Sequence, residues 1–383
     1  MQLIEHRALL NLSLEVVCCP MATATQPLTS VPLFTPFLVR SVSFRHRIVV
    51  SPMCQYSSED GFATDWHLVH LGSRAVGGAA QVCVEATAIS PEGRITPACL
   101  GIWKDEHIPK LAQIAKFIES RGAVPAIQLS HAGRKASVRT PGQGGTFLRK
   151  SDGGWQTVAP SPVPFRPDDE VPHELTASEI TVVVEDHVAA ARRAVAAGFR
   201  VIEIHAAHGY LLNEFMTPLA NQRSDQYGGS LDNRIRLTLE VIRAIRAVIP
   251  AEMPLFMKIS AVDWAEGGWT IEDSVHLAVE AKRAGVDLIT CSSGNVVAHQ
   301  KVDFKPGFQV PFAETVRCRA GIPTAAVGLI TQPGQANEIV ENEKADLIVM
   351  AREFLRDPYF PLHAAKALGV KVPFPPQYTP AFV

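Results

Sequence analysis

The fold is decided by Val201-Ile202-Glu203-Ile204-His205-Ala206-Ala207-His208-Gly209-Tyr210. This stretch begins as a short apolar strand, and two imidazoles and a phenol follow where the strand stops. Gly209 lies between them and relaxes the backbone. Barrel enzymes keep their chemistry at the carboxyl ends of their strands, so the stretch predicts a catalytic strand end. A purely structural interpretation would have to explain three proton-carrying side chains within six residues.

Eight short runs have the apolar character of strands that are buried on both faces. They are Ile48–Val50, Gln81–Glu85, Val124–Gln128, Val201–Ile204, Leu255–Ile259, Leu288–Cys291, Thr324–Val327 and Leu347–Val349. Helical patterns lie between them, at Ile108–Ser120, Ser178–Ala197, Asn233–Val248, Ile271–Ala284 and Gln332–Glu341. This alternation predicts an α/β fold, a closed (β/α)8 TIM barrel. The alternative is an open doubly wound sheet, but the Gly-x-Gly-x-x-Gly turn usual after an early strand of that fold is missing.

The chain is expected to form one barrel domain over residues 31–383. Residues 1–30 differ in character from the periodic sequence that follows and are interpreted as a disordered leader, with an upstream extension before a start at Met21 as one form of it. Acidic Glu5 stands where a secretory signal needs positive charge, which argues against such a signal. A mitochondrial leader, with Arg7 as its basic residue, is the open alternative. After the third strand comes a long Gly- and Pro-rich insert, residues 129–176, which we interpret as a cap over the mouth of the barrel.

Composition argues against several classes of partner. The formal net charge is -2, so there is no electrostatic reason to expect nucleic acid or an acidic membrane surface. Apolar runs fall short of the about 18 residues that a membrane-spanning helix needs. The seven cysteines are scattered without a Cys-x-x-Cys pair, which favours free thiols in a reducing compartment and a cytoplasmic protein.

Polar residues at other strand ends are further candidates. Cys54 follows Pro52 after the first strand and is either a cofactor contact or an inert core thiol. The amide of Gln128 offers donors and an acceptor to the edge of a heterocycle, or it bonds a loop. Lys258 lies within an apolar run, and burying a lysine is costly unless it meets an anion. Its position therefore predicts a ligand with a charge to stabilise.

The last three strands are followed by small residues and an arginine. The segments are Ser292-Ser293-Gly294, Gly328-Leu329-Ile330 and Ala351-Arg352-Glu353. Loops in these places commonly bind phosphate through backbone N–H groups and a guanidinium. They predict a phosphate-bearing cofactor.

Taken together, these motifs resemble those of the old yellow enzymes, which are FMN-dependent ene-reductases, and within them the subgroup with a cysteine beside the flavin. The resemblance covers Leu33 to Tyr378. It rests on motifs in the family's order, namely Pro52-Met53-Cys54-x-Tyr56-Ser57, Glu85-Ala86-Thr87, His131-Ala132-Gly133-Arg134-Lys135, His205-x-x-His208-Gly209-Tyr210 and Arg223-x-Asp225-x-Tyr227-Gly228-Gly229-Ser230.

The resemblance implies FMN as cofactor and NADPH as the source of hydride, with NADH also open. It implies ping-pong reduction of the activated C=C bond of α,β-unsaturated carbonyl compounds such as enones and maleimides. His205 and His208 would bind the substrate carbonyl, Tyr56 would line the pocket, and Tyr210 would donate the proton. The implied cofactor-binding residues are Ser51, Pro52, Met53, Cys54, Ala86, Gln128, Lys258, Ser293, Gly328, Ala351 and Arg352.

The sequence departs from the family's pattern at two places. Lys258 stands where the family usually has arginine. Lysine keeps the positive charge but lacks the planar guanidinium that can donate two parallel hydrogen bonds. The C-terminal Gln377-Tyr378-Thr379-Pro380 lacks the arginine that the subgroup often extends into a neighbouring subunit, so a homodimer is left open.

Two rival interpretations stay open. One is a metal-dependent barrel hydrolase or lyase that uses His205 and His208 as ligands, with Asp263 as the nearby carboxylate. The other is a catalytically silent flavin-binding barrel. The interpretation that we favour has no metal.

Overall fold

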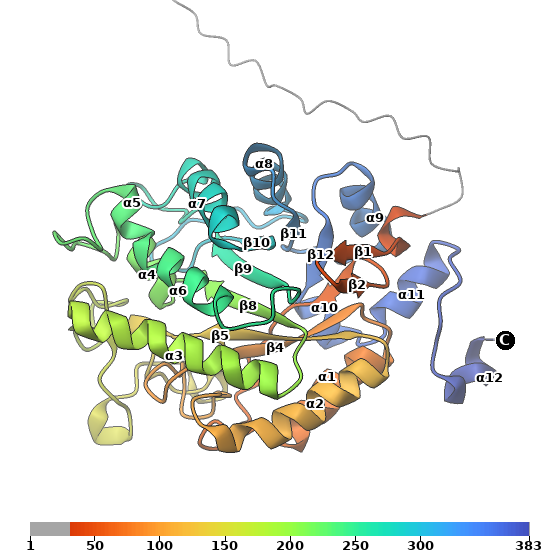
Figure 1. The fold of residues 1–383 in the computed structure, drawn as a ribbon, viewed down its shortest axis with the longest axis horizontal. Coiled ribbons are helices and arrows are strands. Elements are labelled where there is room, and N and C mark those ends of the chain that lie inside the picture. The colour runs from red at the N-terminus through yellow and green to blue at the C-terminus, as the bar shows by residue number, and fades with distance from the viewer. Residues whose placement is uncertain (1–30, 383) are drawn as a thin grey trace, which may run out of the picture.

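The computed structural model describes residues 31–382, so the expected leader over residues 1–30 lies outside the described residues. All eight expected strands are present. They are β3 (Ile48–Val50), β4 (Gln81–Ala88), β5 (Val124–Ser130), β8 (Val201–Ala206), β9 (Leu255–Ser260), β10 (Leu288–Ser292), β11 (Thr324–Ala326) and β12 (Leu347–Met350). They pair in parallel and close in the order β10-β11-β12-β3-β4-β5-β8-β9, in the middle of the molecule in Figure 1. The expected (β/α)8 barrel is confirmed.

Helices surround the barrel. They include α1 (Asp65–Val76), α2 (Ile108–Ser120), α3 (Ala177–Ala196), α6 (Arg236–Arg246), α7 (Ile271–Ala284), α8 (Val310–Ala320), α9 (Pro333–Glu341) and α11 (Phe360–Ala367). Thr176 and Thr270 cap α3 and α7, since each hydroxyl accepts a hydrogen bond from a first-turn backbone N–H. Among the helices of residues 31–382, none is long and apolar enough to cross a membrane.

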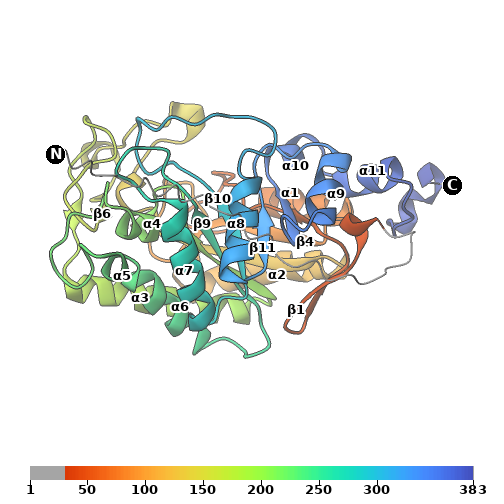
Figure 2. The same cartoon turned by 90° about the horizontal axis from the view of Figure 1, so that it is seen from above.

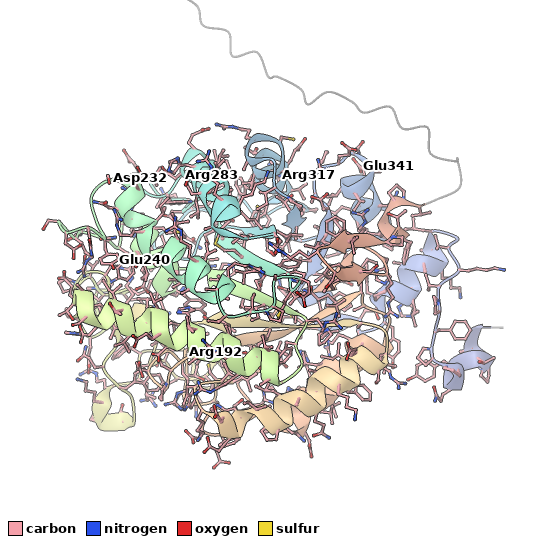
Figure 3. The ribbon with its side chains drawn as sticks, viewed as in Figure 1. Arg192, Asp232, Glu240, Arg283, Arg317 and Glu341 are labelled. Carbon is pink, nitrogen blue, oxygen red and sulfur yellow. The ribbon has the colours of Figure 1, made fainter. Side chains whose placement is uncertain are left out.

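The outward faces of these helices carry charge. Figure 3 labels six such side chains on outer helices, namely Arg192, Asp232, Glu240, Arg283, Arg317 and Glu341. The inward faces are apolar and form the main core with the outward-facing residues of the strands. Ligand chemistry is therefore expected at an end of the barrel and not on its sides.

Several boundaries differ from the sequence expectations by one to three residues, and one expected helix is divided. The strand β5 continues through Leu129 and Ser130, so the insert begins at His131. The strand β4 continues to Ala88 and has an irregular register between Val84 and Ala86, which re-aims the side chains there. The helix expected over Asn233–Val248 is split into α5 (Leu231–Arg234) and α6.

The split lies at Ile235, which is buried and ends α5. Arg234 donates to the Met216 carbonyl at 2.7 Å and so fastens α5 to the end of α4 (Leu211–Met216). This tertiary contact overrides a periodicity that would allow one continuous helix.

A hairpin that the sequence analysis missed closes one end of the barrel. It consists of β1 (Phe37–Val39) and β2 (Val42–Phe44), which pair antiparallel. Phe44 is fully buried and stacks on Phe256 inside the barrel, with ring centroids 6.1 Å apart. The hairpin shares an apolar cluster with the first residues of the strands, so the open mouth is at the strands' carboxyl ends.

The insert after β5 contains turns and the two-residue strands β6 (Val158–Ala159) and β7 (His173–Glu174), which pair with each other. In Figure 2, β6 lies close to α4, the helix that follows Tyr210, and the two are in contact. Arg134 donates to the carbonyl of Val163 within the insert and to that of Val296 beyond β10. These bonds fasten the insert at the carboxyl end of the barrel, where we expected a cap.

Candidate active site

Alternation along the strands decides which side chains face the barrel axis. Ile202 and Ile204 pack toward the helices, so Glu203 and His205 face inward. In the register, His205 is opposite Lys258 on β9, and Lys258 is opposite Thr290 on β10. The interior therefore brings an imidazole, an ammonium group and a hydroxyl into one layer. The Lys258 ammonium is buried and donates to the Ser51 hydroxyl at 3.2 Å.

A cavity of about 280 Å³ opens at this end. The loops after β3, β10, β11 and β12 contribute to its lining. The candidates among its lining residues are Ser51, Pro52, His208, Lys258, Ser293, Gly328, Ala351 and Arg352. Residues predicted for the phosphate and for one flavin edge thus share one cavity with His208.

The remaining candidates lie beside this cavity and not on its lining. Cys54, Tyr56 and Tyr210 pack on a small apolar cluster that contains Cys99. The Cys54 thiol hydrogen-bonds with the backbone of Ala86 and with the Tyr56 side chain. Met53 packs on the main core instead, and Gln128 is buried inside the barrel.

His205 and His208 lie between the cavity and the apolar cluster that contains Cys99. The ring of His205 lies 5.2 Å from that of His208, which lines the cavity, and 4.9 Å from that of Tyr210. Burial, followed by His208 and then Lys258 and Lys135, holds the pKa of His205 well below its usual value. Burial, followed by the same two lysines, lowers the pKa of His208 to about 3. Both imidazoles are therefore neutral at physiological pH, and each has one N–H to donate.

Hydrogen bonds indicate where those protons are. The backbone N–H of Ala207 donates to His205 Nδ1 at 3.3 Å, which leaves Nε2 of His205 as its N–H donor. The backbone N–H of His208 donates to Ser260, and its Nε2 lies 2.7 Å from the hydroxyl of Ser292. His208 has a φ of 62°, so these bonds hold it in a left-handed conformation uncommon for a residue with a side chain.

Tyr210 and Cys54 are both uncharged. Burial raises the pKa of the Tyr210 phenol well above its usual value, and the neighbouring Cys54 and Tyr56 add to the shift. Burial also raises the pKa of the Cys54 thiol, as does Glu85. Tyr210 therefore remains a proton donor, and Cys54 is a neutral thiol rather than a reactive thiolate.

The cavity has a rigid wall near Gly328. The Gln309 side chain accepts from the Ser293 hydroxyl at 2.6 Å and donates to the Val327 carbonyl at 3.2 Å. Gly328 has a φ of 122°, and a Cβ there would approach Gln309 Nε2 to 3.0 Å. Gln309 thus fixes the loops after β10 and β11 to each other.

Sequence reasoning overlooked several of these residues. Glu203 is an acidic residue within an apolar run, so the burial argument that identified Lys258 would also have found it. Lys135 donates to the carbonyls of His208 and Asn295 and lies 5.3 Å from the Tyr210 ring centroid. In the sequence Lys135 stands out only as part of the motif His131–Lys135. Gln309 had no comparable signal, because a glutamine before a helix is common.

The metal interpretation finds no support. Asp263, the carboxylate that it needed, accepts hydrogen bonds from Thr217 and from the backbone of Trp269. Within the described part of the chain, no group of three His, Cys, Asp or Glu residues is placed to hold a metal ion.

The residues of the cavity fit FMN. Lys258 supplies positive charge from β9 and Arg352 from the segment after β12, and Ser293 and Gly328 lie on the loops that would cradle a phosphate. The Ser51 hydroxyl on the lining and the Gln128 amide beside the cavity are neutral hydrogen-bonding groups that suit a heterocycle.

Known proteins carry the same pattern. The sequence model of the NADH:flavin oxidoreductase / NADH oxidase family matches residues 32–370. An NADPH dehydrogenase of Geobacillus thermodenitrificans is 47% identical over 348 residues, which cover 90% of this chain and 97% of the relative. An NADPH dehydrogenase of Bacillus licheniformis is 48% identical over 352 residues, which cover 91% and 98%. Among solved structures, morphinone reductase is similar with a TM-score of 0.74 and 27% identity, covering 91% of this chain and 93% of that one.

The family match spans nearly all of the described barrel, and the relatives align over almost their whole length. The closed barrel agrees with the fold similarity to morphinone reductase. The chain therefore belongs to the NADH:flavin oxidoreductase / NADH oxidase family and is an FMN-dependent NAD(P)H oxidoreductase of the old yellow enzyme type.

Proposed function

We propose that this enzyme reduces the activated C=C bond of α,β-unsaturated carbonyl compounds, such as enones and maleimides. The observation that carries the proposal is the pair of neutral imidazoles, His205 and His208, with rings 5.2 Å apart beside the cavity. Bound FMN, once reduced by NADPH or NADH, supplies the hydride. Because both nicotinamide and enone need the same cavity, we expect ping-pong kinetics.

The role proposed for the histidines is to bind the substrate's carbonyl oxygen. Two N–H donors on one oxygen withdraw electron density from the conjugated double bond, which makes its β-carbon electrophilic. Neutral imidazoles suit this role because they donate without needing a counter-charge in a buried site.

The role proposed for Tyr210 is to protonate the α-carbon. Its phenol is held protonated by burial and lies 4.9 Å, ring to ring, from His205. A phenol is a weak acid, so placement and not acidity must supply its advantage. Tyr56, packed on the same apolar cluster, would line the pocket.

The cofactor-binding roles are proposed from the same arrangement. Ser293, Gly328, Ala351 and Arg352 would hold the phosphate, as their shared lining of the cavity supports. Ser51, Pro52, Met53, Cys54, Ala86, Gln128 and Lys258 would contact the flavin ring. Of these, Lys258 would meet its most electron-rich edge, because a buried ammonium group needs an anionic partner.

The surroundings of the site support further proposals. The insert after β5 would act as a cap, since Arg134 ties it to the loop after β10. The partners would be small molecules, and a homodimer remains a prediction. We also propose a reducing, cytoplasmic setting, supported by free thiols at the cysteines of the described residues.

An anaerobic titration tests the function. NADPH should bleach the yellow protein, and cyclohexenone or N-ethylmaleimide should then restore the colour in stoichiometric amounts. Reduction by NADPH without reoxidation by either compound would contradict the ene-reductase proposal. A protein that NADPH does not bleach would instead favour the silent flavin-binding barrel.

A further inference from the structure

A carboxylate lies inside the barrel at a place to which the proposed reaction assigns no role. Glu203 on β8 is only 6% exposed and faces the barrel axis. Its Oε1 accepts from Gln128 Nε2 at 2.7 Å, and its Oε2 accepts from the Thr290 hydroxyl at 2.7 Å. The carboxylate thus connects β5 to β10 across the interior.

The position of Glu203 is directly next to the cofactor cavity. It lines a separate interior cavity of about 10 Å³, which has room for no more than one water molecule. Pro52 and Val349 line both this cavity and the large one. Glu203 therefore lies beneath the cavity that fits FMN, separated from it by shared lining residues.

An opposite charge lies on the neighbouring strand. Glu203 is opposite Phe256 on β9, two residues before Lys258, and Lys258 is opposite Thr290, which donates to Glu203. Burial raises the pKa of the Cys83 thiol most, and both charges also act on it, since Glu203 raises this pKa further and Lys258 lowers it. In an interior with so little water, charges act over several ångströms with little screening.

The hydrogen bonds also fix the amide of Gln128. A carboxylate only accepts, so Gln128 must turn its amino group toward Glu203. This removes the ambiguity between the oxygen and nitrogen of the amide. The Gln128 carbonyl oxygen is then the acceptor that remains for another ligand.

We propose that Glu203 is a positioning residue for FMN. Glu203 orients the Gln128 amide and places a negative charge beneath the cofactor cavity, and this charge counteracts the positive charge of Lys258. Reduced FMN carries more negative charge than oxidised FMN, so the carboxylate disfavours the reduced form. The inference rests on FMN binding and not on the substrate proposed above.

The variant Glu203→Gln tests the charge. It keeps the shape, still accepts from Gln128 and can still bond Thr290, but it is neutral. We expect the ratio of affinities for reduced and oxidised FMN to rise about tenfold, which equals about 30 mV for a two-electron couple. The midpoint potential is measured by anaerobic dithionite titration with a reference dye.

Thr290→Val is the matched control. It removes one hydrogen bond to the carboxylate and keeps the charge, so the potential should stay at the wild-type value even where FMN binds less tightly. An unchanged potential in Glu203→Gln would overturn the proposal. An equal rise in Thr290→Val would also overturn it, since that result would trace the effect to packing.

A further variant, which keeps an acidic side chain, makes the test decisive if Glu203→Gln does not fold or does not bind FMN. Glu203→Asp keeps the charge but shortens the reach to Gln128, so we expect weaker FMN binding with an unchanged potential. A raised potential in Glu203→Asp would contradict the charge role. Because dithionite is the reductant, neither NADPH nor an enone takes part, and a failed substrate proposal leaves this test intact.

Discussion

The Nε2 atom of His208 lies 2.7 Å from the hydroxyl oxygen of Ser292. The same hydroxyl is 3.4 Å from Gln309 Oε1, but this oxygen already accepts a hydrogen bond from the Ser293 hydroxyl at 2.6 Å. The Ser292 proton is therefore best placed on the bond to His208, where Nε2 accepts it. This assignment leaves the imidazole proton on Nδ1, so His208 donates to a ligand from that atom.

Ser292→Ala should remove the hydrogen bond that keeps the ring proton of His208 on Nδ1, so that the proton can also be carried by Nε2. We expect about a tenfold loss in kcat/KM for cyclohexenone, or about 1.4 kcal/mol of transition-state stabilisation, with little change in FMN content. Stopped-flow measurement of flavin reoxidation reports the effect. Ser120→Ala is the control, because this exposed serine on α2 donates to the Phe117 carbonyl and should keep the wild-type rate. A wild-type rate in Ser292→Ala would refute the assignment.

Tyr210→Phe should remove the proposed proton donor. We expect reoxidation by cyclohexenone to slow by about 100-fold or more, which is the usual contribution of a positioned acid. Reduction by NADPH should keep its rate, because that step needs no proton from the phenol. Tyr56→Phe serves as the comparison and should affect binding more than rate. Equal slowing of both half-reactions in Tyr210→Phe would rule out the proton-donor role.

Lys258→Arg should change how FMN is held, because it introduces a planar guanidinium where a compact ammonium now donates to Ser51. We expect a shift in FMN affinity, in midpoint potential, or in both, measured by ultrafiltration and by dye titration. Lys258→Met, which removes the charge, should lose about tenfold or more in FMN affinity. If Lys258→Arg alters neither quantity, the proposed contact between residue 258 and the flavin is wrong.

Glu214 gives a pH dependence of stability. The residue is fully buried, accepts from the Arg134 backbone N–H at 2.9 Å, and burial raises its pKa to about 8. The native carboxyl keeps its proton up to about pH 8, whereas the unfolded chain releases it near its ordinary value of 4.5. Its contribution to the free energy of unfolding is therefore fully present below that value and is lost as pH rises toward 8.

Glu214→Gln should remove this dependence while keeping an acceptor for Arg134. Between about pH 5 and 7 we expect the Tm of the wild type to fall more steeply than that of the variant. The comparison stops at about pH 7 because burial lowers the pKa of Lys135 to about 7. Above that pH the native protein releases the Lys135 proton more readily than the unfolded chain does, so this group makes the free energy of unfolding rise with pH. The exposed Glu338→Gln is the control and should follow the wild type. Parallel curves for wild type and Glu214→Gln would contradict the shifted pKa.

The barrel could be predicted because its strands are apolar on both faces. In β9, Met257 and Ile259 pack on the helices while Phe256 fills the interior, so the run Leu255–Ile259 is apolar except for Lys258. The exception then identifies a functional position. The same reasoning applies to Glu203, although the sequence cannot show that Gln128 and Thr290 supply its donors, because both come from other strands.

Other features depend on tertiary contacts that no local pattern contains. The hairpin of β1 and β2 has strands too short for a clear alternation, and burial of Phe44 against Phe256 stabilises it. The left-handed backbone of His208 follows from its bond to Ser260, 52 residues away. The partner of its ring, Ser292, appeared in the sequence only as part of a phosphate loop.

The hairpin under the barrel also governs how ligands reach the site. With Phe44 and its neighbours filling the lower end, molecules cannot pass through the barrel from one side to the other. If the proposed reaction holds, spent nicotinamide would have to leave through the open mouth before an acceptor could enter. The closed lower end would then contribute, together with the chemistry of the site, to the alternate binding of the two substrates.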